Sequence, residues 1–328
     1  MNSAIVVLNW NDWRNTVDCL ESIYQNDGNF DVFLVDNGSY QKNILKISSW
    51  HEGRIISDRS FIKPKINNRG KLIFMNFKNN IFDKKKNDRN LYLFRNKSNL
   101  GLTAGLNRIY SFLIRNKYQY ILRIDNDFIV PRDYFKKISL TIKQKDVVSA
   151  SPKIMHAYIK KSVWFKGFKM SWSYLKFQRT MNLKKKRYFD NLNFNKLVET
   201  DAISGCCSIY KANVLKKSGL GDEDFFYGPE DIELSYRLKK YGKLVCNQKI
   251  KTFHKIAKSS SIAKKFDRTF ETTYSFLILI KKIGTFSDKL FGYSYFLLRG
   301  FYYFLLENNK EKKNGYKKAI IKFFIQDV

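Results

Sequence analysis

Carboxylates are scarce in this chain of 328 residues, which carries 29 Asp and Glu against 61 Lys and Arg and a formal net charge of +32. So large an excess of positive charge indicates an anionic partner, such as a nucleotide, a nucleic acid or an acidic membrane surface. Compositional bias is a plainer explanation, since Lys, Asn, Ile and Phe are all abundant. Where the few carboxylates gather beside strands and helices, they are candidate metal ligands and general bases.

Cysteine is scarce as well, with four residues in the chain. These residues show neither the spacing of metal ligands nor a disulfide framework, so a reducing compartment is expected. The four are Cys19, Cys206, Cys207 and Cys246.

Long apolar runs are also missing. Ala4–Leu8 is too short for the apolar core of a signal peptide and is followed by polar residues. The longest apolar stretch, Leu290–Leu306, is interrupted by Arg299 and falls short of the roughly 20 residues that span a bilayer. We therefore expect neither a secretory signal nor a transmembrane helix.

Short apolar runs alternate with helical patterns in the first part of the chain. Apolar strands that alternate with helices predict an α/β fold, with a Rossmann-like, mostly parallel central sheet flanked by helices. The expected strands are Ala4–Leu8, Asp31–Val35, Leu72–Phe77, Leu91–Phe94 and Tyr120–Ile124, and the expected helices are Asp12–Tyr24 and Thr103–Lys117.

Polar side chains follow several of these strands. Asn9, Asp36, Asn99, Asp125 and Asp127 each come directly after a predicted strand. Ligands of parallel sheets bind outside the carboxyl ends of the strands. We therefore expect these residues to converge at one edge.

The remainder of the chain is less regular. Trp50–Asn90 is basic and Asn-rich, with a mobile loop expected at Asp83–Asn90. Val147–Glu199 is expected to be rich in loops with short strands. Pro229–Tyr241 reads as a helix, and Leu244–Cys246 as a short strand.

Two acidic clusters stand out against the basic background. Asp125-Asn126-Asp127 follows a buried strand, where a pair of carboxylates can hold a divalent cation, although Asn and Asp also favour plain turns. Glu230-Asp231-Ile232-Glu233 opens a helix, where acids also complement the helix dipole. The long turn Gly219–Pro229 before it is acidic and aromatic, which favours a site.

Taken in order, these segments resemble the motifs of family 2 glycosyltransferases. The resemblance extends from about Ala4 to Ser261 and is strongest to rhamnosyltransferase-like bacterial enzymes that build surface polysaccharides. The matching segments are Ala4–Asn11, Leu34–Ser39, Asn99–Asn107 with the pattern N-x-G-x-x-x-G-x-N, Asp125–Asp127, Ser204–Cys207, Gly221–Phe226 and Pro229–Leu234.

The resemblance implies a GT-A fold, a nucleotide-diphosphate sugar donor and inversion at the anomeric carbon. Asn9 and Asp36 would contact the nucleobase and ribose, and Asn99 and Asn107 would support the donor pocket. The full donor-binding set that it implies is Leu8, Asn9, Asp36, Asn99, Gly101, Asn107 and Asp125.

The resemblance also implies the catalytic groups. Asp127 would ligate Mg²⁺ or Mn²⁺, with His254 completing the metal site, although a lone His after a strand is more often structural. Asp231 would be the general base, with Glu230 as a neighbour or alternative. Gly205 and Trp164 would lie on the acceptor side.

The predicted domains are a catalytic GT-A domain at residues 1–262 and a helical, aromatic and basic extension at residues 263–328. The extension either packs on the core or also holds the enzyme on an anionic membrane, at the inner face of the cytoplasmic membrane. The acceptor expected there is a saccharide or a lipid-linked saccharide.

Two other functions fit parts of the sequence. A nucleotidyltransferase also pairs carboxylates with a metal, but the first strand is not followed by the Gly and Lys of a phosphate-binding signature. A nucleic-acid-binding protein would explain the charge. No zinc site, RRM signature or helix-turn-helix pattern supports it, and no nucleic-acid partner is expected.

Overall fold

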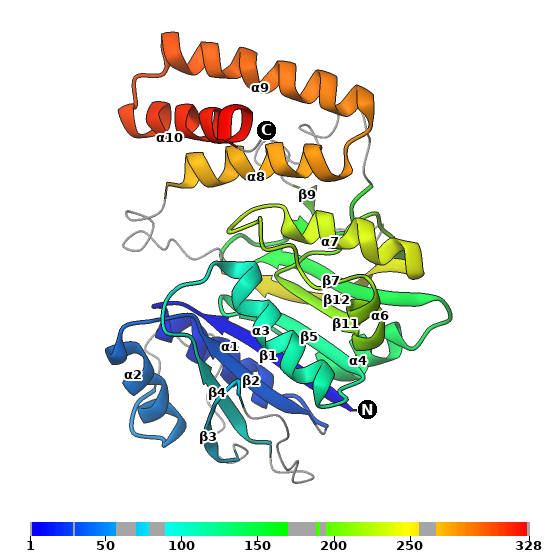
Figure 1. Ribbon diagram of the computed structural model, residues 1–328. Helices are drawn as coiled ribbons and strands as arrows, with labels where there is room; N and C mark the ends of the chain where they lie inside the picture. The colour runs from blue at the N-terminus through cyan, green and yellow to red at the C-terminus, as the bar shows by residue number, and fades with distance from the viewer. Residues whose placement is uncertain are drawn as a thin grey trace.

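The computed structural model describes residues 2–28, 30–56, 70–78, 89–169, 188–190, 195–255 and 267–326. One mixed sheet lies at its centre, with helices on both faces and a further helical layer at one end (Figure 1). The path through the sheet runs β10-β12-β7-β11-β5-β1-β2-β4-β3. The expected α/β fold, with a central sheet between helices and a helical C-terminus, is confirmed.

The strands are β1 (Ser3–Asn9), β2 (Asp31–Asp36), β3 (Leu72–Met75), β4 (Leu91–Arg95), β5 (Tyr120–Asp125), β6 (Phe128–Ile129), β7 (Val147–His156), β8 (Ser162–Phe165), β9 (Tyr188–Phe189), β10 (Leu197–Glu199), β11 (Cys207–Lys211) and β12 (Lys243–His254). The helices are α1 (Trp13–Tyr24), α2 (Gln41–His51), α3 (Leu102–Arg115), α4 (Tyr134–Ile142), α6 (Ala212–Lys217), α7 (Glu230–Leu238), α8 (Arg268–Ile283), α9 (Phe286–Leu306) and α10 (Lys310–Ile321). A 3₁₀ turn (Lys239–Tyr241) follows α7, and a π-helical turn (Lys322–Gln326) follows α10.

The half of the sheet built from β3, β4, β2, β1 and β5 is parallel throughout. Beyond β5 the sheet is mixed, because β11 runs antiparallel to both β5 and β7 while β7 and β12 are parallel. The register aligns the strand ends, with Asn9 opposite Asp36 and Leu8 opposite Asp125. Asn9, Asp36 and Asp125, three of the polar residues expected at one edge, therefore end neighbouring strands there.

Alternate residues of each central strand supply two cores, as the pleat requires. Ile5 and Val7 of β1 face a core closed by α1, α2 and α4. Ala4 and Val6 face a second core closed by α3, α6 and α7. Both faces of the sheet are therefore covered, which explains why its central parallel strands are largely apolar.

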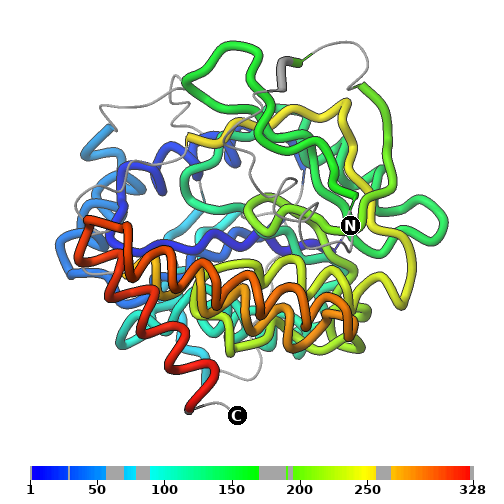
Figure 2. The backbone as a smooth tube through the Cα atoms, turned by 90° about the horizontal axis from the view of Figure 1, so that it is seen from above, coloured from blue at the N-terminus to red at the C-terminus, as the bar shows by residue number. Residues whose placement is uncertain are grey.

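A third apolar cluster joins the C-terminal helices to the rest of the molecule. Leu277 and Ile278 of α8 pack with Phe225 of the turn before α7 and with Ile232 of α7 itself. Figure 1 and Figure 2 show α9 as the outermost helix of this layer. The predicted boundary at residue 262 lies outside the described residues and stays a prediction. Among the helices that the structure describes, none is long and apolar enough to cross a bilayer.

The structure corrects several expectations outside the parallel half. The irregular region Val147–Glu199 contains the ten-residue strand β7, and the short strand expected at Leu244–Cys246 extends over all of β12. Helix α2 was not expected. The expected mobile loop at Asp83–Asn90 falls outside the described residues except for its last two.

Candidate active site

The floor of the site is a hydrogen-bonded pair at the ends of β1 and β2. Asn9 donates from Nδ2 to Asp36 Oδ1 at 3.0 Å, and both side chains are fully buried. Asn9 Oδ1 accepts from Thr16 Oγ1 at 2.8 Å, and Asp36 Oδ2 accepts from the Ser39 backbone N–H at 3.1 Å. The pair fixes the loop after β2 against α1, and its contact with a nucleobase and ribose stays a prediction.

Asn99 and Gly101 shape the approach to α3. Asn99 Oδ1 accepts from the Gly101 backbone N–H at 2.9 Å and from Asn37 Nδ2 at 2.8 Å. Gly101 has a φ of 83°, and a Cβ there would lie 2.7 Å from the ring of Phe226. Only glycine fits this position without strain. The segment therefore lies directly against the acidic turn Gly219–Pro229.

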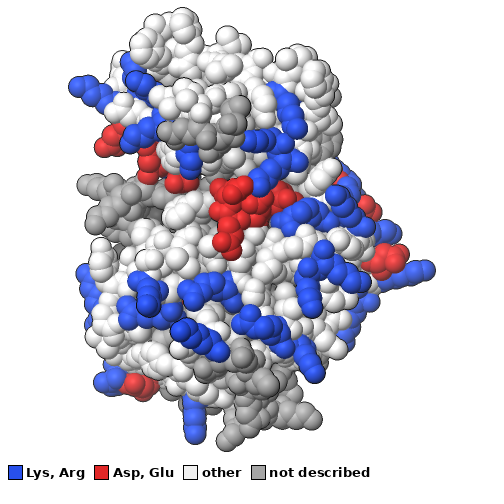
Figure 3. All heavy atoms as spheres, in the orientation of Figure 1, with Lys and Arg blue, Asp and Glu red and all other residues white. Residues whose placement is uncertain are grey.

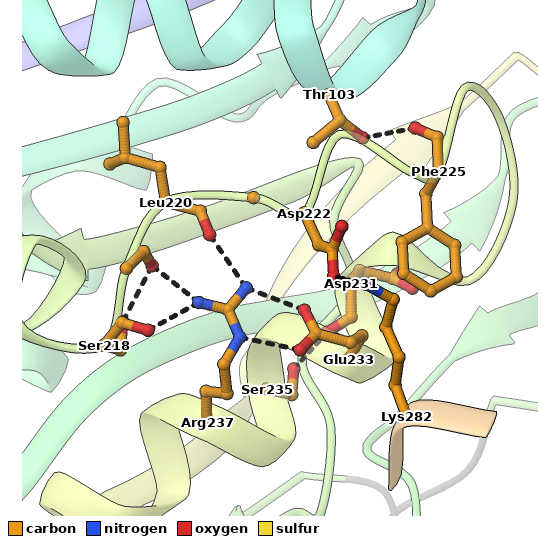
Figure 4. Close-up of polar contacts among 12 residues, drawn as sticks. Thr103, Ser218, Leu220, Asp222, Phe225, Asp231, Glu233, Ser235, Arg237 and Lys282 are labelled. Atoms are coloured by element: carbon orange, nitrogen blue, oxygen red, sulfur yellow. Dashed lines mark hydrogen bonds and ion pairs between the residues drawn. The ribbon is translucent and has the colours of Figure 1, made fainter. Parts of the chain in front are cut away.

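Asn107 of α3 holds the same turn from its other end. Its Nδ2 donates to the Gly221 carbonyl at 2.8 Å, and its Oδ1 accepts from the Gly221 N–H at 2.9 Å. One turn earlier, Thr103 Oγ1 donates to the Phe225 carbonyl at 2.8 Å (Figure 4). These hydrogen bonds hold the acidic turn against α3. The predicted role of Asn107 in supporting the donor pocket stays a prediction.

Arg123 is a site residue that the sequence did not reveal. It lies two residues before Asp125 on the same face of β5 and is only 5% exposed. Its Nε donates to Asp125 Oδ1 at 3.1 Å, and its Nη1 lies 3.4 Å from Glu230 Oε1. A cation inside an otherwise apolar strand is the signal that could have identified it. Arg123 therefore links the end of the central strand to the start of α7.

Asp127 and His254 come together from different parts of the chain. Asp127 Oδ2 lies 3.0 Å from His254 Nε2, and His254 is the last residue of β12. The imidazole stacks on Phe128 with ring centroids 4.5 Å apart, and Trp164 meets it edge-on at 5.0 Å. Its buried Nδ1 has no hydrogen-bond partner among the described residues. Aromatic packing, rather than a second hydrogen bond, fixes the ring toward Asp127.

These two side chains fit a divalent cation. Asp127 and His254 offer a carboxylate oxygen and an imidazole nitrogen 3.0 Å apart, and together they would hold the ion. Within the described part of the chain, no group of three or more His, Cys, Asp or Glu side chains could enclose a metal. A site with so few protein ligands suits an ion that is also held by substrate phosphates and water.

Trp164 and Lys255 occupy places that the sequence did not predict. Trp164 lies against His254, so its predicted contact with an acceptor stays a prediction. Lys255, the residue after His254, has its ammonium buried in an ion pair with Asp18 of α1.

Asp231 lies at the start of α7, opposite the segment before β11. Its Oδ2 accepts from the Gly205 backbone N–H at 2.9 Å. A Cβ on Gly205 would lie 2.8 Å from Arg123 Nη1 and 2.9 Å from Asp231 Cβ. Gly205 is therefore needed for the close approach of its backbone to the carboxylate, and its predicted contact with an acceptor stays a prediction.

The segment before β11 connects the end of β5 with the carboxylates at the start of α7. Burial raises the pKa of the Cys206 thiol well above its usual value, and the negative charges of Asp125, Asp231 and Asp127 raise it further. The Gly205 backbone N–H donates to Asp231 Oδ2 at 2.9 Å, so the Gly205–Cys206 segment contacts the start of α7. The backbone N–H of Asp125 also donates to the Cys206 carbonyl at 2.7 Å.

Residues 76–219 of the chain match the family model described as glycosyl transferase family 2. This segment is just under half of the chain, and together with the fold it supports a family 2 glycosyltransferase. No curated protein matches its sequence.

Solved structures share the fold of this glycosyltransferase, which is GT-A. GalNAc-T7 with UDP, GalNAc and Mn²⁺ has a TM-score of 0.57 and 13% identity, over 99% of this chain and 56% of that chain. The mannosyltransferase PcManGT from Pyrobaculum calidifontis, with GDP-Man and Mn²⁺, has a TM-score of 0.53 and 12% identity, over 100% of this chain and 88% of that chain. TarS 1-349 from S. aureus has a TM-score of 0.53 and 12% identity, over 98% of this chain and 80% of that chain. The glycosyltransferase thus spans just over half the length of GalNAc-T7.

The two carboxylates at the start of α7 differ in exposure and in ionisation. Burial, followed by the charge of Asp231, raises the pKa of Glu230 to about 8, against the opposing effect of Arg123. Burial also raises the pKa of Asp231, while the hydrogen bond from Gly205 lowers it. Glu230 is 7% exposed and Asp231 is partly exposed. Asp231 is therefore the better placed of the two to accept a proton from a substrate of the glycosyltransferase.

Glu230→Gln is expected to keep kcat within about tenfold of the wild-type glycosyltransferase near pH 7, because the amide resembles the protonated carboxyl. Since the folded-state pKa of about 8 exceeds the usual 4.5, the stability due to protonated Glu230 is present at low pH and is lost as the pH rises through about 8. The variant should lose less stability than wild type between about pH 5 and pH 9 in urea unfolding. A kcat loss as large as that of Asp231→Asn, or an equal pH dependence of unfolding, would contradict this assignment.

Helix α8 ties the C-terminal layer of the glycosyltransferase to the acidic turn. Lys282 Nζ lies 2.5 Å from Asp222 and 2.6 Å from Asp224 (Figure 4). Ser275 Oγ donates to the Tyr227 carbonyl at 2.8 Å. Figure 3 shows acidic atoms gathered on this face between the C-terminal helices and the body of the molecule. Helix α8 of the C-terminal layer therefore contacts the turn that precedes Glu230 and Asp231.

Proposed function

We propose that this glycosyltransferase moves a sugar from a nucleotide-diphosphate sugar to a saccharide acceptor, with a divalent metal and with inversion at the anomeric carbon. The observation that carries the proposal is that the Gly205–Cys206 segment bonds both to Asp231 and to Asp125, two residues before the Asp127 that pairs with His254. A cation site for a departing diphosphate and a base for an incoming hydroxyl then flank one space.

The donor class is supported by the solved structures with the same fold. GalNAc-T7 was solved with UDP and Mn²⁺, PcManGT with GDP-Man and Mn²⁺, and TarS with UDP-GlcNAc. In this chain, we propose that the ends of β1 and β2 and the start of α3 bind the nucleoside. Leu8, Asn9, Asp36, Asn99, Gly101, Asn107 and Asp125 are the residues that would form or support that pocket.

The reaction that this geometry supports is a single displacement. Asp231 takes the proton of an acceptor hydroxyl, and the hydroxyl oxygen forms a bond to the anomeric carbon. The bond between that carbon and the diphosphate oxygen breaks, and the electron pair leaves with the nucleoside diphosphate. Attack opposite the leaving group inverts the anomeric centre. Asp127 and His254 would hold Mg²⁺ or Mn²⁺, whose charge would stabilise the leaving diphosphate.

Arg123 and Glu230 set the charge around this base. The Arg123 guanidinium is held between Asp125 and Glu230, so it keeps Asp125 oriented at the end of β5. Its positive charge also favours the ionised form of Asp231, which a general base needs. Gly205 donates to the same carboxylate and fixes its direction.

The acceptor that we propose is a lipid-linked saccharide used in bacterial surface polysaccharide synthesis, met at the inner face of the cytoplasmic membrane. This proposal is based on the resemblance to rhamnosyltransferase-like enzymes and on the aromatic and basic C-terminal helices. The contacts from α8 to the acidic turn support it, because they place those helices beside the start of α7.

Binding of a panel of nucleotide sugars tests the proposed donor. Calorimetry with UDP-, GDP- and dTDP-linked hexoses, each with and without Mn²⁺, is expected to find at least one donor whose affinity rises by about tenfold or more with the ion. Nucleoside triphosphates should gain no comparable advantage over that donor. Tight binding of nucleic acid at moderate salt, with no nucleotide sugar bound under any condition, would contradict the proposal.

A further inference from the structure

Helix α9 presents an apolar face that no described element covers. Its buried residues, Asp288, Gly292 and Phe296, lie four apart along one side and face the rest of the layer. Ten apolar or aromatic residues of the helix are exposed, most of them on the opposite side. They are Phe286, Leu290, Phe291, Leu297, Leu298, Phe301, Tyr302, Phe304, Leu305 and Leu306, which we call the outer face of α9. Both sides of this helix are thus apolar, whereas a surface helix ordinarily turns a polar side to water.

Two of the three charged residues of α9 are held away from the outer face, and the third, Lys289, is half-buried beside Leu290. Asp288 is buried in a capping box with Thr285. Arg299 packs over the rings of Tyr295, Tyr303 and Tyr316, with centroid distances of 5.9, 5.5 and 5.9 Å. Figure 3 shows the corresponding end of the molecule as largely uncharged. An uncharged stretch of this size on a chain of +32 marks an interaction surface.

Cations border this surface on the neighbouring helix. The exposed lysines of α10 are Lys310, Lys312, Lys317 and Lys318. A fifth, Lys313, lies over the ring of Phe304 at 4.8 Å, so its ammonium adjoins the outer face itself. Lysines beside an aromatic and aliphatic face are the pattern of a helix that lies in the interface of an anionic membrane.

We propose that the outer face of α9 inserts, parallel to the surface, into the headgroup region of an anionic membrane. The charge pattern favours a membrane over a second copy of the chain. Two copies joined through α9 would bring their α10 lysines toward each other, and each copy carries +32. Anionic lipid headgroups neutralise the same lysines while the acyl boundary takes up the Phe and Leu side chains.

This surface also places the active site relative to the lipid, and that step rests on the proposed function. Phe296 of α9 packs in the same cluster as Leu277 of α8, and α8 holds the acidic turn through Lys282 and Ser275. One helical layer therefore separates the membrane from the turn before Asp231. A saccharide attached to a membrane lipid is the class of acceptor that this arrangement suits.

Vesicle sedimentation of the full-length protein tests the surface. The variant Leu298→Glu/Phe301→Glu changes two side chains that are 72% and 65% exposed, so it should fold normally. The matched control is Leu140→Glu, whose side chain is 62% exposed on α4. The wild type and the control are expected to bind vesicles of phosphatidylglycerol and phosphatidylcholine, and to bind less as salt rises. The double variant should bind at least about tenfold more weakly.

Three results would overturn the proposal. They are the absence of vesicle binding by the wild type, equal binding by the double variant, and a dimer in light scattering that the double variant abolishes. Donor affinity, measured on the same samples, separates this proposal from the proposed function. Donor binding retained without vesicle binding would reject the membrane surface alone, whereas vesicle binding without donor binding would reject the proposed donor and leave the surface standing.

Discussion

Asp231→Asn is expected to lower kcat by roughly 10²–10⁴-fold, the usual contribution of a general base, while the donor affinity changes little. Asn retains an oxygen that can accept the hydrogen bond from Gly205, so the local fold should survive. What is lost is the ability to take a proton from the acceptor. The measurement is kcat with a saturating donor, beside donor affinity by calorimetry.

The pH profile gives an independent check on the same residue. A base acts only when it is deprotonated, so kcat of the wild type should fall as the pH falls through the raised pKa of Asp231. The residual activity of Asp231→Asn should lack this acidic limb. Lost donor binding combined with high residual turnover would show that Asp231 binds the donor and is not the base.

Asp127→Asn is expected to remove the metal dependence of donor binding while the protein remains folded. An amide is neutral and binds a hard cation more weakly than a carboxylate, and His254 alone cannot hold the ion. Calorimetry with and without Mn²⁺ should therefore give the same weak donor affinity for this variant. Turnover should fall with it, because the diphosphate would leave without a cation.

Asp133→Asn is a suitable control for this prediction. Asp133 pairs with Lys137 at the exposed start of α4, so the variant makes the same chemical change away from the site. Its donor affinity and metal response should match the wild type. Near-normal turnover by a folded Asp127→Asn variant would remove Asp127 from the metal site.

The parallel half of the fold could be predicted because its strands are short and apolar on both faces. Their alternation with helices predicts a parallel sheet, and the register brings Asn9 opposite Asp36 and Leu8 opposite Asp125. The same reasoning placed Asp125 and Asp127 at the carboxyl end of β5. Missing helix α2 was avoidable, since Ile44, Ile47 and Trp50 have helical spacing and are buried.

The mixed half resisted prediction for physical reasons. Strand β7 contains Pro152 and Lys153, which break the apolar pattern of a central strand. In the fold, Lys153 is buried in an ion pair with Asp190 at 2.6 Å, a partner 37 residues away. Strand β12 is interrupted by a register shift between Asn247 and Lys251. Compensation between distant residues has no local signature in a sequence.

The site was predicted in its residue types better than in its contacts. The pairing of Asp127 with His254 depends on β6 and β12 lying side by side, which no local pattern indicates. The contacts of Arg123 with both Asp125 and Glu230 could not be predicted without the fold either. Asn107 was expected to support the donor pocket, which stays a prediction, and the structure shows that it bonds to Gly221 of the acidic turn. Local motifs thus predicted which residue types form the site, whereas their contacts depend on how the strands pair.

Release of nucleoside diphosphate tests the central claim most directly. The donor selected by the binding panel is incubated with the wild-type enzyme and an acceptor saccharide, and nucleoside diphosphate is measured with Mn²⁺, after chelation, and after the ion is restored. The account predicts release that stops on chelation and resumes with the ion, together with a glycosylated acceptor of inverted anomeric configuration. Release that is unaffected by chelation, or a product that retains the anomeric configuration, would contradict it.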